Sequence, residues 1–163
     1  MRLKITVLLL IVWALAAVAS AQTKISGTAQ CGKPELLYAI QVGDRPNHSF
    51  VISQSKCSYT KFTGIAGMIA KEFVGTTFSE ISGNRATSRA FAYATMDNSD
   101  KFQFRSQGSA TMKEGVVESD EGTWTFVGGT GKLKGLKGKG TYKGKAGPEG
   151  ITLEIEGEHE LAK

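Results

Sequence analysis

The amino-acid sequence predicts an all-β domain built from antiparallel strands. Three observations support this: β-branched and aromatic residues recur in short segments, Gly, Asn and Asp separate these segments, and apolar and polar residues alternate within them. The 163 residues include 20 Gly and 3 Pro, and 40% are apolar. This composition is typical of one folded domain and unlike a disordered or collagen-like chain.

The first 21 residues are predicted to be a cleaved signal peptide. Arg2 and Lys4 flank the start of an almost wholly apolar segment, residues 5–18, and the segment 19–21 has the small residues that a signal peptidase requires. The apolar segment, about 14 residues, is shorter than the roughly 20 needed to span a bilayer, which argues against the alternative of an uncleaved anchor. The sequence therefore predicts a secreted or periplasmic domain, residues 22–163, with no stable membrane anchor after cleavage.

Nine segments carry the β-branched and aromatic residues that are typical of strands. They are Thr23–Cys31, Leu36–Val42, Ser49–Ser55, Lys71–Ser82, Arg85–Met96, Lys101–Lys113, Gly122–Val127, Lys137–Lys143 and Ile151–Glu158. The segment Gly64–Ala70 is short and glycine-rich, and could be a loop or a helical turn. Turn sequences at 83–84, 97–100 and 147–150 join successive strands over few residues, which predicts antiparallel neighbours in a meander.

Alternation along these segments indicates one buried face per strand. The apolar residues expected to share the inner face include Phe102, Phe104, Trp124, Phe126, Leu153 and Ile155. In the segment 85–96 alanines alternate with larger residues, and inward-facing alanines would leave space. Such strands can close into a barrel or fold into a sandwich, and a barrel of about eight strands is either filled by side chains or holds one small ligand.

Cys31 and Cys57 are the two cysteines of the chain, and in an exported protein they are expected to form a disulfide. A metal pair and a catalytic thiol are the alternatives. Both lack partners, because the two histidines, His48 and His159, lie at no ligand spacing from a cysteine or from each other. We therefore predict a structural disulfide and no metal site, and expect both histidines at the surface.

Basic residues are concentrated late in the chain. Without Arg2 and Lys4 the formal net charge falls from +5 to +3. A segment without acids contains Lys132, Lys134, Lys137, Lys139, Lys143 and Lys145. Five glutamates follow within residues 149–160, so the two blocks would largely cancel. The lysine segment also has only Tyr142 for stacking on bases, so we favour a solvated hairpin that protects a strand edge and predict no nucleic-acid partner.

The most specific local pattern is a glycine-rich turn. Gly128–Gly131 reads Gly-Gly-Thr-Gly, and Leu133 and Gly138 follow. Glycines allow positive φ and close packing, and the apolar residue can fold back to close a barrel end. In these residues the chain resembles the allene oxide cyclase and dirigent group of β-barrels, and more closely a bacterial secreted branch of it. The resemblance implies a single closed, calycin-like antiparallel barrel of about eight strands.

The glycines match neither a phosphate-binding loop nor a dinucleotide motif, so no cofactor is predicted.

A second similarity concerns the segments Leu37–Gln41 and Asp44–His48, which resemble the early strand and Asp-Arg turn of allene oxide cyclases. In that family the strand supplies a Glu and an Asn, and the turn ends in a Pro. The matching positions here hold Ala39, Gln41 and His48, so the acid is absent and the resemblance does not imply cyclase activity. No hydrolase or metalloprotease motif is present in the sequence, and catalytic residues are therefore not assigned.

Four polar residues could form a cluster in a barrel mouth: Glu80, Arg89, Tyr93 and Arg105. A carboxylate beside guanidinium groups would orient a polar ligand head. The favoured alternative is an exterior cross-strand ladder, because the opposite face of these strands is the apolar one.

Three functions remain open. The favoured one is binding of a small hydrophobic molecule by the inner-face residues named above, namely Phe102, Phe104, Trp124, Phe126, Leu153 and Ile155, near Tyr93 or Tyr142. The second is a cyclase or dirigent-type isomerase or stereochemical guide, which needs at least one acid or Arg inside the barrel. The third is a structural or polysaccharide-associating envelope protein.

Overall fold

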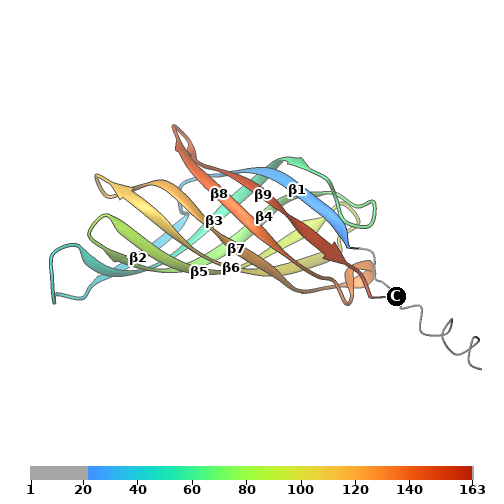
Figure 1. Ribbon diagram of the computed structural model, residues 1–163, viewed down its shortest axis with the longest axis horizontal. Coiled ribbons are helices and arrows are strands. Elements are labelled where there is room, and N and C mark those ends of the chain that lie inside the picture. Colours follow the sequence, from blue (N-terminus) through green and yellow to red (C-terminus); the bar gives the residue numbers. More distant parts are fainter. Residues whose placement is uncertain (1–21, 163) are drawn as a thin grey trace, which may run out of the picture.

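The computed structural model describes residues 22–162, so the predicted signal peptide, residues 1–21, lies outside the described residues. Nine strands and one short 3-10 helix follow each other along the chain (Figure 1). They are β1 (Thr23–Cys31), β2 (Leu36–Gln41), β3 (His48–Phe62), β4 (Ala70–Ser82), β5 (Arg85–Met96), β6 (Lys101–Lys113), β7 (Val116–Gly129), η1 (Gly131–Leu133), β8 (Lys137–Gly147) and β9 (Gly150–Glu160).

Eight of the strands form a closed antiparallel barrel. Their order is β1-β9-β8-β7-β6-β5-β4-β3, and the pairing of β1 with β3 closes the cylinder. β2 is an additional strand that pairs with β3 outside this ring. The prediction of a single closed all-β barrel of about eight antiparallel strands is therefore confirmed.

Along its length, β3 pairs first with β2 and then with β1. Its first part, Ser49–Gln54, pairs with β2, whereas Cys57–Phe62 pairs with β1. β3 therefore extends well beyond the predicted end at Ser55. The lysines and serines after Ser55 have little strand propensity, but they occupy the outer face while Cys57 and Tyr59 point inward and pack in the core.

A disulfide joins β1 and β3 at the barrel seam, the place where the pairing of these two strands closes the barrel. Cys31 and Cys57 are direct cross-strand partners in the β1–β3 pairing, and their sulfur atoms are 2.01 Å apart. The predicted disulfide is confirmed. Such a bond is typical of proteins that fold outside the reducing cytoplasm.

Two loops close one end of the barrel, the right-hand end in Figure 1 where η1 lies. The loop after β7 brings Leu133 and Leu136 into the core, and the loop after β3 brings in Ile65 and Met68. Leu133 packs so closely on Gly129 that a Cβ there would lie 2.6 Å from the Leu133 Cβ. Leu133 therefore packs into this end of the barrel, as the sequence predicted. Ile65 and Met68 form an isolated bridge around a turn, so this part of the predicted segment Gly64–Ala70 is a loop, and Ala70 begins β4.

The opposite end carries the β4–β5, β6–β7 and β8–β9 turns and is open to solvent. Inward-facing residues near it, including Val51, Ala110 and Met112, are only half-buried, whereas Phe102 and Leu133 near the closed end are fully buried. The barrel interior is therefore accessible from one end.

Lysines and glutamates form a ladder on the outer surface of β8 and β9. Lys139 pairs in register with Glu158, and Lys143 pairs with Glu154. Adjacent charges of opposite sign cancel at distances beyond a few ångströms, as the sequence predicted. The expectation that the lysines protect a strand edge was wrong, because β8 lies between β7 and β9 within the closed sheet.

Candidate functional site

A cavity of about 190 Å³ lies inside the barrel. Six residues that the sequence predicts at a ligand site line this cavity: Phe102, Phe104, Trp124, Phe126, Leu153 and Ile155. Their common placement follows from strand alternation, because each lies at an inward position of β6, β7 or β9. The sequence pattern thus located the wall of the cavity.

The rings of this wall pack on one another at the closed end. Phe102 and Phe126 meet edge to face with centroids 5.3 Å apart, and Phe73 and Phe104 do so at 5.5 Å. Trp124 stands 4.9 Å from Phe126. We call these five residues the aromatic wall. Edge-to-face pairs are favourable beyond the area they bury, so these contacts hold the five rings together as one apolar surface.

Glycines behind the wall create the space in front of it. The indole of Trp124 lies against Gly140 on β8 and Gly157 on β9, where a Cβ would come within 2.5 Å of its Cζ2 atom. The ring of Tyr142 lies in the same way over Gly108 and Gly122. Both rings lie flat on the sheet because the four positions have no side chains. A backbone carbonyl, that of Thr141, accepts the Trp124 Nε1–H at 3.2 Å and fixes the indole.

Polar lining residues lie beyond the aromatic wall, toward the open end. On β6 the inward order from the closed end is Phe102, Phe104 and Ser106, and on β7 it is Phe126, Trp124, Gly122 and Asp120. The lining residues that form this polar part, which we call the polar end, are Ser55, Thr77, Ser88, Ser106, Asp120 and Tyr142. The cavity is therefore amphipathic along the barrel axis.

Asp120 is the one carboxylate among the described lining residues of the cavity. The Tyr142 hydroxyl donates a hydrogen bond to its Oδ1 at 3.2 Å. Burial raises the pKa of Asp120, and the hydrogen bond from Tyr142 partly opposes that rise. Burial, followed by the Asp120 charge, raises the pKa of Tyr142 as well. Burial alone raises the pKa of Tyr59, which also faces the cavity. These groups combine a proton donor and an acceptor in a largely apolar space.

Sequence reasoning missed Asp120. It lies within Glu118–Glu121, an acidic and polar stretch that resembles a solvated turn, and the predicted strand began only at Gly122. A bulge at Glu118 shifts the register between β6 and β7, so that both Val117 and Asp120 share the inner side. Extending the alternation of Trp124 and Gly122 backward by one step would have found it.

Tyr93, which was predicted to lie near the ligand, is outside the cavity. It projects from the outer face of β5, is 43% exposed, and carries the Lys101 ammonium 5.8 Å from its ring centroid. The alternation of β5 explains this, because Ala90, Ala92 and Ala94 occupy the inner positions. The inward alanines expected from the sequence thus exclude Tyr93 from the wall.

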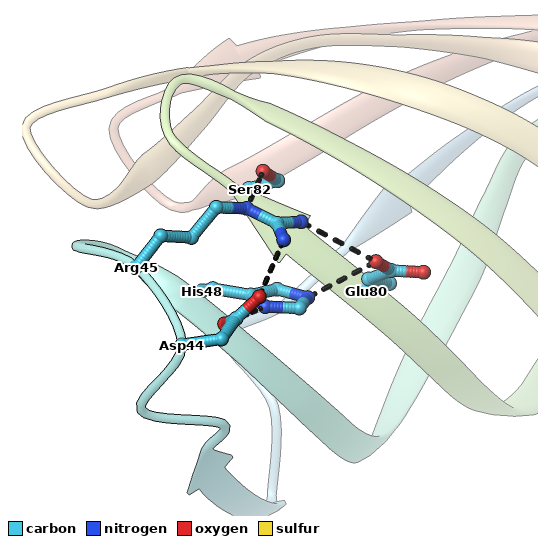
Figure 2. A network of polar contacts seen from close by, with 5 residues as sticks. All are labelled: Asp44, Arg45, His48, Glu80 and Ser82. Carbon is cyan, nitrogen blue, oxygen red and sulfur yellow. Dashed lines mark hydrogen bonds and ion pairs between the residues drawn. The ribbon is translucent and has the colours of Figure 1, made fainter.

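The predicted polar cluster also lies outside. Arg89 and Arg105 are exposed, and Glu80 instead joins a network with the β2–β3 connection, shown in Figure 2. There, the two ring nitrogens of His48 lie 2.5 Å from Asp44 Oδ1 and 3.1 Å from Glu80 Oε1. The exterior placement, the favoured alternative, is the one observed.

Arg45 completes this network. Its guanidinium lies 2.6 Å from the Asp44 carboxylate, and its Nε donates to Ser82 Oγ at 3.2 Å. The hydrogen bond with His48 lowers the pKa of Asp44. Because Asp44 and Arg45 come from the connection and Glu80 and Ser82 from β4, the network fastens the connection to the barrel (Figure 2).

The positions that match the catalytic positions of allene oxide cyclases do not form one site. Ala39 and Gln41 are exposed on β2, and His48 belongs to the outer network. His48 and His159 are both buried, so the expectation of surface histidines was wrong. The Nδ1 atom of His159 has no hydrogen-bond partner, and burial lowers the pKa of this side chain.

Within residues 22–162, no three His, Cys, Asp or Glu side chains are arranged to hold a metal ion. No helix in this part of the chain is long and apolar enough to cross a membrane.

Comparisons with known proteins bear on the fold. No protein-family model matches the chain, and no curated protein matches it. A solved structure does: a protein of unknown function from the DUF3224 family of Shewanella oneidensis MR-1, with 20% identity, a TM-score of 0.51, and coverage of 87% of this chain and 100% of the other. At this identity the similarity supports the architecture, and the chain is thus a closed β-barrel with the fold of that protein.

Proposed function

We propose that this protein is secreted or periplasmic and binds one small, mainly apolar molecule inside its barrel. The observation that carries the proposal is the one-ended, amphipathic cavity of about 190 Å³. The disulfide and the apolar N-terminal segment, with its small residues at 19–21, support export.

The cavity volume limits the ligand. An engineered cavity of about 150 Å³ with apolar walls binds benzene, whereas sites for drug-sized ligands measure about 300–1,000 Å³. A volume of about 190 Å³ therefore suits one ring with a short substituent, or an aliphatic chain of similar size. The aromatic wall offers such a ligand an apolar surface, and the open end offers it an entrance.

Trp124 makes binding directly measurable. The chain has two tryptophans, and Trp13 lies in the predicted signal peptide. With Trp13→Phe, all tryptophan emission comes from the cavity wall. We expect a saturable change in this emission on titration with benzene, toluene and propylbenzene, and a loss of affinity for larger alkylbenzenes.

Two leucine variants on β5 distinguish cavity binding from surface binding. Ala90 lines the cavity, whereas its neighbour Arg89 is exposed. Ala90→Leu should fill part of the space and weaken toluene binding about tenfold or more, whereas Arg89→Leu should leave it unchanged. Equal effects of the two variants, or the absence of saturable binding by any probe, would contradict the proposal.

Asp120 supports a second candidate, the cyclase or dirigent-type isomerase or stereochemical guide. That function requires an acid or base inside the barrel, and the half-buried Asp120 carboxyl, whose pKa is raised by burial, fulfils this requirement. The test is to incubate a bound ligand with the protein and with Asp120→Asn, and to compare the products by chiral chromatography. An unchanged ligand in both samples counts against catalysis.

The third function, association with acidic polysaccharide, is less favoured because the lysines of β8 pair in register with glutamates of β9, which neutralise their charge.

A further inference from the structure

The polar end of the cavity presents a carboxylate and hydroxyl groups to the interior. We infer that Asp120 and Tyr142 select a small amphipathic amine, whose ammonium lies against the Asp120 carboxylate while its apolar part rests on the aromatic wall. This inference rests on the proposed binding function and specifies its ligand class.

Asp120 is placed to receive a ligand group. It is held inside the barrel beside small neighbours, because its cross-strand partners are Ala110 on β6 and Gly144 on β8. Its Oδ1 accepts the Tyr142 hydroxyl, and the backbone of Glu121 gives it a further hydrogen bond. A carboxylate has about four acceptor sites, so acceptor capacity remains for a ligand.

Among residues 22–162, no cationic side chain acts on Asp120. The titratable groups that act on it are Tyr142 from β8 and Glu121 from its own strand, and neither is a cation. Ser88 on β5, Leu153 on β9 and Ser106 on β6 complete its side of the lining without charge. The neighbouring lysines of β8 point outward, since Tyr142 and Gly144 take the inner positions.

A half-buried carboxylate without a neighbouring cation has an unfavourable desolvation free energy, and a ligand cation would offset it. Opposite charges in a partly desolvated site form strong hydrogen bonds, whereas a ligand carboxylate would meet like charge. The distance between the aromatic wall and Asp120 is short, since Trp124 and Asp120 are separated by one inward position on β7. A ring with a two-carbon amine chain therefore matches both parts of the cavity.

Three probes that share a phenyl ring on a two-carbon chain and differ in the head group test the inference: 2-phenylethylamine, 2-phenylethanol and 3-phenylpropanoate. In the Trp13→Phe protein at pH 7, the amine should bind about tenfold or more tightly than the alcohol, and the carboxylate should bind most weakly. Asp120→Asn should remove the preference for the amine and leave alcohol affinity within about threefold. Tyr142→Phe should reduce the preference less, because it removes a neutral partner of the carboxylate.

A pH titration provides the same test without a variant that alters folding. Because the amine needs ionised Asp120, its affinity should increase with pH across the raised pKa of that carboxyl and then level off. The affinity of 3-phenylpropanoate should decrease over the same range, and that of the alcohol should change little.

The outcomes separate this inference from the proposed function. If the alcohol binds and the amine does not bind more tightly, or if Asp120→Asn keeps the amine preference, the inference is wrong while cavity binding stands. If none of the three probes binds, nor any alkylbenzene, both are wrong.

Discussion

The disulfide at the barrel seam should contribute a large part of the stability. Cys31 and Cys57 are 26 residues apart in the sequence, and closing a loop of that length restricts the unfolded chain by about 3.5 kcal/mol in the loop-entropy model. The double variant Cys31→Ala/Cys57→Ala should therefore lose about that free energy of unfolding, and its melting temperature should fall by roughly 10 °C or more.

Urea unfolding, followed by Trp124 fluorescence and by far-ultraviolet circular dichroism, measures the effect. The urea dependence of unfolding should be steeper in the variant, because a chain without the cross-link exposes more surface when unfolded. Reduction of the parent protein by dithiothreitol is the matched control and should give the same loss. A loss below about 1 kcal/mol in both samples would refute the reasoning, since the loop would then be constrained by other means.

Three further predictions concern the cavity and the closed end. Gly140→Ala should displace the indole of the cavity wall and reduce the free energy of unfolding by about 1–3 kcal/mol, with a shift in tryptophan emission. Leu133→Ala should reduce it by about 2–5 kcal/mol because the side chain is fully buried. Asp120→Asn should alter the dependence of stability on pH: the pKa of Asp120 is raised in the folded state, so its contribution is most favourable below the unfolded pKa of about 4 and is lost as pH increases through the folded pKa.

Each of these predictions has a control. Gly147→Ala should change stability by less than about 0.5 kcal/mol, since a Cβ there meets no atom closer than 3.8 Å. Val127→Ala is the exposed counterpart of Leu133→Ala, and equal losses for the two would show that Leu133 does not close the barrel end. For Asp120, a parent-minus-variant difference in stability that does not change between pH 4 and pH 7 would contradict the stated sign.

The strand pattern made the architecture predictable, because alternation in β6, β7 and β9 identifies the residues that point inward. Cys57 illustrates what the pattern left out. It lies in a part of β3 where lysines and serines cover the outer face, so propensity suggested a loop, and only pairing with β1 makes this part a strand.

The candidate site was predictable for its apolar half alone. Trp124 and Phe126 could be assigned from alternation, and the same alternation continues through Gly122 to Asp120 without interruption. Asp120 was missed because the acidic stretch before Gly122 suggested a turn, so the predicted strand began too late. Tyr93 was misassigned although the alanines of β5 already required it to point outward. Polar residues in a barrel are assigned by register, and register depends on long-range pairing.

The glycines beneath Trp124 and Tyr142 have a consequence for how such a barrel could diversify. The cavity volume depends on the glycines on which these two rings lie. Substitutions at Gly108, Gly122, Gly140 or Gly157 would move an aromatic ring and change the volume, while every side chain that contacts the ligand would stay chemically the same. Ligand size and ligand chemistry can thus vary independently, the first through residues that never touch the occupant and the second through Asp120.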